Sequence, residues 1–153
     1  MIVDASVILR AFFPDEEQDQ AQAMIRDHVI AHLPLEAPDL LLYEVTKAVV
    51  QARRCGRLND EQAQELLSAF GGLGVALKPV SWQQMLPMAL RFDRPAYDAA
   101  YLALAEADAQ PLITGDARMY NAVREHLHWC NGSATIRLPA TWADSSPETV
   151  SRF

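Results

Sequence analysis

Short apolar stretches that show no polar alternation separate the helical segments of this chain, and they restrict its fold more than any other sequence feature. A strand that is covered on only one face alternates polar and apolar residues, whereas a strand in a parallel sheet covered on both faces does not. Because helices lie between the stretches, we predict an α/β fold built from βα units, with a parallel sheet at its centre. The predicted strands lie within residues 1–3, 32–38, 75–80, 111–115 and 134–138.

The predicted helices are bounded by ordinary start and stop signals. Ser6 is expected to cap a short helix that Pro14 ends, and Asp39 to cap a longer helix that ends at Gly56. Asp15 is expected to begin a further helix, because Gln18 stands at the capping-box spacing. In full, the predicted helices cover residues 7–13, 15–30, 40–55, 59–72, 82–92, 94–110 and 117–127.

Length and charge limit the classes of function. With 153 residues the chain is expected to form one domain, over residues 1–142, followed by a polar tail over 143–153. A formal net charge of −7 argues against electrostatic binding of nucleic acid over the whole surface. No apolar run approaches the roughly 20 residues of a membrane span, and no secretory signal precedes the domain, so we expect a cytoplasmic protein with no membrane partner.

Four carboxylates have ordinary interpretations when each is taken alone. Asp4 and Asp116 follow predicted strands, where an acid can form an Asx turn or cap the next helix. Asp98 lies near the start of the helix 94–110 and can cap it or complement the positive end of its dipole. Glu44 borders the apolar stripe of its helix, where an ion pair with Lys47 is the simplest partner.

Taken together, the same four acids indicate a metal site. Asp4 and Asp116 stand at the carboxyl ends of parallel strands, where ligands bind in open α/β sheets, and Asp98 and Glu44 lie in early helical turns. Carboxylates that are close together cannot all stay ionised without a cation. Since oxygen ligands alone are offered, the cation is expected to be Mg²⁺ or Mn²⁺, which would suit hydrolysis of a phosphodiester.

Four stretches of the sequence resemble the acidic motifs of PIN-domain ribonucleases, and most of all the VapC-type toxin of VapBC toxin–antitoxin pairs. They are MIVDASVILRAFF, APDLLLYEVTKAVV, YDAAYLALAEADAQPLITGD and ARMYNAV. The resemblance spans Met1 to Leu138. It implies a three-layer α/β/α sandwich with a central parallel sheet, and a Mg²⁺- or Mn²⁺-dependent endoribonuclease. It also implies two partners, an RNA substrate and a small antitoxin that blocks the cleft.

The resemblance assigns a role to each matching residue. Asp4 and Asp98 would be the main metal ligands, and Asp116 would complete the metal site directly or through water. Glu44 would orient the water that the ion activates, or hold a second ion. Ser6 and Thr114 match small hydroxyl residues that hold the acids in place. The catalytic set is therefore Asp4, Glu44, Asp98 and Asp116, with Asp4, Asp98 and Asp116 on the metal and Ser6 and Thr114 as support.

Other interpretations stay open at this point. Some relatives carry another acid shortly after the last motif, but this chain has Arg118 and Asn121 there. The chain can therefore also be a non-catalytic PIN-like module that binds RNA or a protein. A phosphatase with an Asp4 nucleophile is disfavoured, because Ser6 stands where such enzymes carry a second aspartate.

Apolar helix surface near residues 11–18 or 65–70 predicts a homodimer. His126 and His128 are taken as surface or packing residues, and Trp82, Trp129 and Trp142 as core or interface aromatics.

Overall fold

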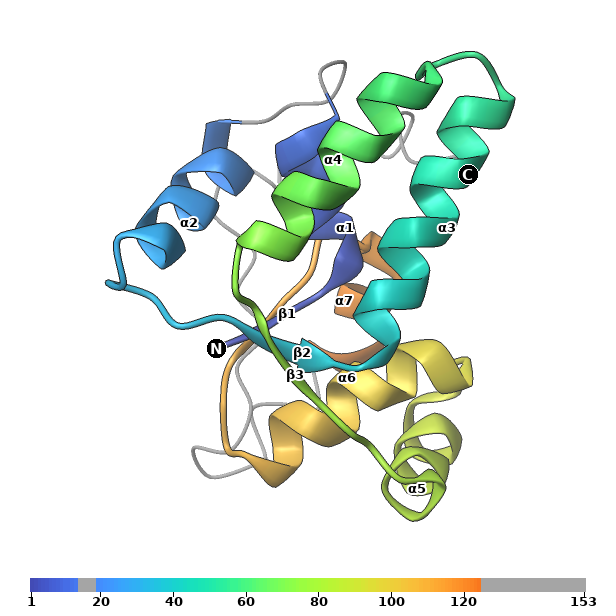
Figure 1. The fold of residues 1–153 in the computed structure, drawn as a ribbon. Helices are drawn as coiled ribbons and strands as arrows, with labels where there is room; N and C mark the ends of the chain where they lie inside the picture. Colours follow the sequence, from blue (N-terminus) through green and yellow to red (C-terminus); the bar gives the residue numbers. More distant parts are fainter. Residues whose placement is uncertain (14–18, 125–153) are drawn as a thin grey trace.

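A computed structural model describes residues 1–13 and 19–124 of the chain (Figure 1). The described elements, in chain order, are β1 (Ile2–Val3), α1 (Ala5–Phe12), α2 (Asp19–Val29), β2 (Glu36–Pro38), α3 (Leu40–Arg54), α4 (Asp60–Gly72), β3 (Ala76–Lys78), α5 (Trp82–Phe92), α6 (Ala96–Ala107), β4 (Leu112–Ile113) and α7 (Ala117–Val123).

The sheet has the strand order β3-β2-β1-β4, and every neighbouring pair is parallel. In its register, Ile2 of β1 is paired with Glu36 of β2 and with Leu112 of β4. Helix α6 packs on β1, β2 and β4, with α5 beside it, while α1 and α3 pack against each other and α3 against β2. Figure 1 shows the sheet between α5 and α6 on one side and the group of α1 to α4 on the other. The predicted α/β/α sandwich with a parallel sheet is confirmed.

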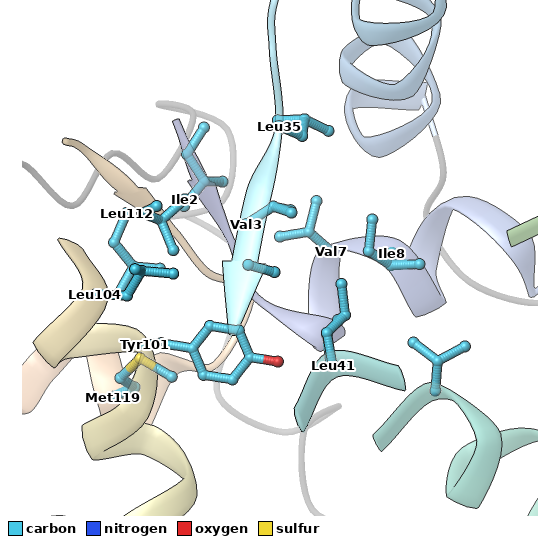
Figure 2. Close-up of a cluster of buried hydrophobic side chains, with 14 of the residues drawn as sticks. Ile2, Val3, Val7, Ile8, Leu35, Leu41, Tyr101, Leu104, Leu112 and Met119 are labelled. Carbon is cyan, nitrogen blue, oxygen red and sulfur yellow. The ribbon is translucent and has the colours of Figure 1, made fainter. Parts of the chain in front are cut away.

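The strand β1 lies at the centre of the core. Ile2, Val3, Leu112 and Leu104 are buried, and Figure 2 shows them around the sheet together with Tyr101. All residues from Ala99 to Ala105 of α6 are buried, and alternate small alanines let this helix approach the sheet closely. Because β1 is covered from both sides, its carboxyl end, where Asp4 follows, is fixed in position.

Two of the predicted helix caps differ from the structure, one in its position and one in its hydrogen bonding. Helix α1 begins at Ala5, so Asp4 occupies the N-cap position and Ser6 lies inside the first turn. Asp39 precedes α3 with helical backbone angles and makes no side-chain capping bond. Other signals are confirmed, since Asn59 and Gln62 form a capping box at α4, and Gly56 adopts φ 74° directly after α3.

The two stretches expected to support a homodimer, residues 11–18 and 65–70, place part of their apolar side chains in the core. Phe13, Leu66 and Phe70 are buried, while Phe12 and Leu67 are half-buried. Large apolar residues are exposed elsewhere, including Tyr43 on α3 and Trp82 on α5; Trp82 is 65% exposed and therefore not in the core.

Several predictions fall on residues outside those the structure describes. They are the start of the helix at Asp15, the end of the helix 117–127, the strand 134–138, the tail 143–153, His126, His128, Trp129 and Trp142. Among the described helices, none has the length and apolar character needed to cross a bilayer.

Candidate active site

Asp4 is held in place by the two hydroxyl side chains that the sequence singled out. Its Oδ2 atom accepts hydrogen bonds from Ser6 Oγ at 2.6 Å and from Thr114 Oγ1 at 2.7 Å. The two hydroxyls are themselves fixed by backbone, because Gly115 N donates to Ser6 Oγ and Asp116 N donates to Thr114 Oγ1. The network therefore joins the end of β1 to the loop after β4.

Asp4 is nearly inaccessible to solvent, with 6% of its surface exposed. Burial raises the pKa of its carboxyl group, the bonds from Ser6 and Thr114 oppose that rise, and the charges of Asp116 and Asp98 add to it. Both hydrogen bonds reach Oδ2, and within the described residues Oδ1 has no hydrogen-bond donor. A buried carboxylate with one unpaired oxygen and acidic neighbours is the electrostatic setting in which a bound cation is stabilising.

Asp116 caps helix α7, as one of its interpretations from sequence proposed. Its Oδ1 atom accepts from Arg118 N at 2.7 Å and from Met119 N at 3.2 Å, so the side chain satisfies two amides of the first turn. Oδ2 of the same carboxylate accepts no hydrogen bond from the residues in the described ranges. One oxygen therefore fixes the side chain and the other stays available to a ligand.

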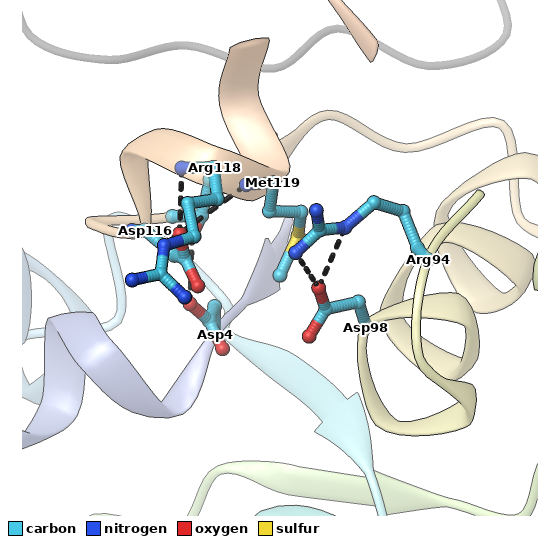
Figure 3. Close-up of polar contacts among 7 residues, drawn as sticks. Asp4, Arg94, Asp98, Asp116, Arg118 and Met119 are labelled. Atoms are coloured by element: carbon cyan, nitrogen blue, oxygen red, sulfur yellow. Dashed lines mark hydrogen bonds and ion pairs between the residues drawn. The ribbon is translucent and has the colours of Figure 1, made fainter. Parts of the chain in front are cut away.

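Asp98 does not cap helix α6, so the interpretation of this residue as a helix cap is wrong. Pro95 occupies the N-cap position and Asp98 is the third residue of the helix. Its Oδ2 atom instead accepts from Arg94 Nε at 2.9 Å and from Arg94 Nη2 at 2.6 Å, and both side chains are 18% exposed (Figure 3). The guanidinium of Arg94 is therefore the counter-ion of this carboxylate.

Glu44 is bonded to a tyrosine from another helix, and no ion pair joins it to Lys47 among the described residues. Tyr101 Oη donates to Glu44 Oε2 at 2.6 Å, which links α6 to α3. Burial raises the pKa of Glu44 to about 7; the Tyr101 bond opposes this rise, and the charges of Asp4 and Asp98 contribute to it. Burial and the same acidic surroundings raise the pKa of Tyr101, so its phenol stays protonated and remains a donor.

The acids thus act on one another across four separate elements. The charges of Asp98 and Asp116 affect Asp4, and those of Asp4 and Asp98 affect Glu44. Figure 3 shows Asp4, Asp98 and Asp116 turned toward a common space, with Met119 beside it. In the part of the chain that the structure describes, no three carboxylates already lie close enough to form a complete metal-binding group. The carboxylate oxygens of these residues are the ligands that a hard divalent ion prefers. Asp98, however, is paired with Arg94 in the metal-free chain.

Sequence reasoning missed three contributors to this site. Arg94 and Tyr101 contact Asp98 and Glu44 directly, and Arg10 Nη2 donates to Gly115 O in the loop before Asp116. The spacing of four residues between Arg94 and Asp98 was a readable signal of an ion pair. Tyr101 carried no such signal, because its partner is 57 residues away in the chain.

Comparison with known proteins agrees with this architecture. A family model described as PIN domain matches residues 1–125. Ribonuclease VapC3 of Pyrobaculum aerophilum is 32% identical over 123 residues, which cover 78% of this chain and 91% of that protein. Ribonuclease VapC9 of Mycobacterium tuberculosis is 31% identical over 119 residues, covering 78% and 87%. The crystal structure of PAE2754 from Pyrobaculum aerophilum superimposes with a TM-score of 0.64 at 21% identity, over 88% of this chain and 81% of that one.

The fold is a parallel α/β/α sandwich with carboxylates gathered at the ends of β1 and β4, and the PIN-domain model matches most of its length. The chain therefore belongs to the PIN-domain family. Within that family it is of the VapC type, since relatives of this name match over more than three quarters of the chain.

Proposed function

We propose that the chain is a metal-dependent endoribonuclease that cuts RNA phosphodiesters, and that it acts as the toxin of a toxin–antitoxin pair. The names of its relatives support the ribonuclease activity. The observation that carries the metal dependence is Asp4, a buried carboxylate with one unbonded oxygen and two acidic neighbours.

Asp4, Asp98 and Asp116 are the residues that would hold Mg²⁺ or Mn²⁺. Asp4 and Asp116 each have one oxygen without a hydrogen-bond donor among the residues described, while the other oxygen is fixed by Ser6 and Thr114 or by the first turn of α7. Asp98 is paired with Arg94 in the metal-free chain. When bound, the ion would stabilise charge on the phosphoryl oxygens and lower the pKa of water. The chain itself orients the three carboxylates.

Glu44 is the residue suited to move a proton. A carboxyl group with a pKa of about 7 exists in both protonation states near neutral pH, which is the condition for efficient general acid–base catalysis. Tyr101 fixes Oε2 of Glu44, so Oε1 is the atom that would accept a proton from the attacking water. Glu44 can alternatively orient that water without taking its proton, or hold a second ion.

The proposed toxin role requires an inhibitor, so we expect a small antitoxin that covers the acidic site. A homodimer also remains a proposal. Its surface would have to lie away from the buried Phe13 and Phe70, and the exposed Trp82, Leu86 and Leu90 of α5, spaced four residues apart on one helix face, offer such a surface.

The decisive experiment measures cleavage of a labelled RNA pool by the purified chain in Mg²⁺, in Mn²⁺ and in EDTA. We expect cleavage only with the divalent ions, and a loss of at least about a hundredfold in Asp98→Asn. Equal cleavage by wild type and Asp98→Asn would exclude the proposal. Binding of RNA that needs no divalent ion and leads to no cleavage would instead indicate the non-catalytic binding module.

A further inference from the structure

Arg94 makes the only ion pair to any of the four acids among the described residues, and it is placed there by a rigid turn. Asp93 before it adopts a left-handed conformation with φ 49°, and Pro95 after it fixes the backbone at the start of α6. Arg94 N donates to Ala89 O, which ties the turn to the end of α5. The backbone therefore aims this side chain at Asp98.

The stability of helix α6 does not account for an arginine at this position. Arg94 lies just before the helix N-terminus, where the macrodipole disfavours a positive charge, and the helix interior begins at Ala96. The gain from this residue comes from Asp98, whose Oδ2 takes two of its N–H groups. A guanidinium thus supplies the positive charge that the cluster of carboxylates lacks.

We propose that Arg94 is a built-in counter-ion for Asp98 that a divalent ion must displace before Asp98 can bind it. This inference rests on the proposed metal site. In the metal-free chain the Arg94–Asp98 pair lowers stability little, because Arg94 neutralises one of the acids that otherwise repel Asp4 and Glu44. The pair lowers the affinity for metal, because Asp98 must turn toward Asp4 and Asp116 to complete the site, and this movement breaks both bonds to Arg94. Arg94 is therefore a positioning residue that sets the concentration of divalent ion at which the site assembles.

The Arg94–Asp98 pair explains why the acids converge in the metal-free chain without forming a complete metal-binding group. Oδ2 of Asp98 is directed toward the guanidinium, and both side chains are largely shielded from solvent. An ion pair that is partly shielded from solvent and made of two hydrogen bonds to a charged group opposes the ion by a modest amount. Release of Asp98 from Arg94 should then change metal affinity by about three- to tenfold.

The test measures Mn²⁺ binding by calorimetry on the full chain after removal of metals, without RNA. We expect Arg94→Gln to bind Mn²⁺ about three- to tenfold more tightly than wild type, and its metal-free form to melt at a lower temperature. Arg91→Gln is the matched control. It removes the same charge from α5 and breaks an ion pair with Glu106 of the same helix α6, and we expect it to bind Mn²⁺ as wild type does. Equal or weaker binding by Arg94→Gln would overturn the proposal.

A simple repulsion between Arg94 and the ion would also tighten binding in the Gln variant, so a second measurement is needed. In Arg94→Lys the charge remains but the paired contact to one oxygen is lost, so displacement predicts an affinity between those of wild type and Arg94→Gln. Repulsion alone predicts the wild-type value. In NMR spectra, the Nε–H signal of Arg94 should move toward its solvent-exposed position as Mg²⁺ saturates the chain. A signal that stays unchanged at saturation would reject displacement.

Failure of this inference can be told apart from failure of the proposed function. If Asp98→Asn binds Mn²⁺ as tightly as wild type does, Asp98 is no ligand and the metal site itself is wrong. If Asp98→Asn loses binding while Arg94→Gln gains none, the metal site stands and only the displacement of Arg94 is rejected.

Discussion

Tyr101 and Glu44 are joined by a 2.6 Å hydrogen bond between helices α6 and α3, although 57 positions separate them in the chain. Tyr101 is buried, its phenol stays protonated, and it opposes the burial that raises the pKa of Glu44. The bond therefore affects both the position of Glu44 and the pH at which it loses its proton.

Replacing Tyr101 with Phe should shift the pH dependence of RNA cleavage upward. Without the phenol, the charged form of Glu44 loses a donor and its pKa rises further above 7. We expect about a tenfold loss of rate at pH 7, partly recovered at higher pH. Tyr97→Phe on the exposed side of the same helix is the control. A profile in Tyr101→Phe with an unshifted midpoint would argue against a role for Glu44 in proton transfer.

Glu44 should make the metal-free chain less stable as pH rises. Its pKa is raised from 4.5 to about 7 in the folded state, so between these values the folded chain holds a proton that the unfolded chain releases. The free energy of unfolding falls over this range and the penalty is complete above pH 7. After allowance for the partial exposure of Glu44, we expect Glu44→Gln to gain about 1–2 kcal/mol at pH 8 and nothing near pH 4.5, measured by urea unfolding in EDTA. An equal gain at both pH values would contradict the assignment.

Asp4→Asn should separate stability from activity. The amide oxygen can still accept the bonds from Ser6 and Thr114, and the buried charge is removed, so the metal-free variant should be as stable as wild type or more so. Its NH₂ group takes the place of Oδ1 and cannot bind a cation, so cleavage and Mn²⁺ binding should be lost. Thermal unfolding and calorimetry on one preparation test both parts, and wild-type affinity for Mn²⁺ would exclude Asp4 as a ligand.

Asp116 can be tested for its two roles with two substitutions. Asparagine caps helices about as well as aspartate, so Asp116→Asn should keep α7 and lose most of the cleavage activity. Asp116→Ala should lose the activity and about 1 kcal/mol of stability as well. If Asp116→Asn cleaves RNA as wild type does, the cap is the whole function of this residue.

Thr114→Val should weaken the network beneath the site. Thr114 is fully buried, and valine of the same shape leaves Asp116 N without its acceptor and Asp4 with one donor fewer. We expect a loss of about 1–3 kcal/mol in urea unfolding. Thr114→Ser keeps the hydroxyl and should lose much less stability than Thr114→Val, whereas equal losses in both variants would mean that the hydroxyl contributes no more than the methyl group does.

The layers of the fold were predictable because they depend on apolar periodicity. Uniformly apolar strands such as Ile2–Val3 and Leu112–Ile113 required cover on both faces, and glycine after α3 ended that helix as expected. The cap predicted at Ser6 was misplaced because Asp4 and Ser6 both stood near the helix start, and the backbone angles decided between them. Asp39 does occupy the N-cap position, but its backbone angles are helical and its side chain makes no capping bond.

The positions of the acids along the chain and the two hydroxyl partners of Asp4 were predictable, whereas Tyr101 as the partner of Glu44 was not. Asp4 and Asp116 follow strands whose ends must meet at one edge of the sheet, which places them from sequence alone. The partners of Glu44 and Asp98 depend on side-chain rotamers and on the angle between α5 and α6. The sequence placed Tyr101 inside the predicted helix 94–110 with no role assigned to it, and Arg94 at the first position of that helix.

The two hydroxyls on Asp4 also bear on which ions the chain can use. With Ser6 and Thr114 both on Oδ2, the lone pairs of that oxygen are occupied and only Oδ1 remains for an ion. Calcium takes six to eight oxygens and often both atoms of one carboxylate, whereas magnesium needs six at shorter range and accepts single contacts. In the proposed metal site, a carboxylate restricted to one oxygen would therefore suit a small ion such as Mg²⁺ better than Ca²⁺.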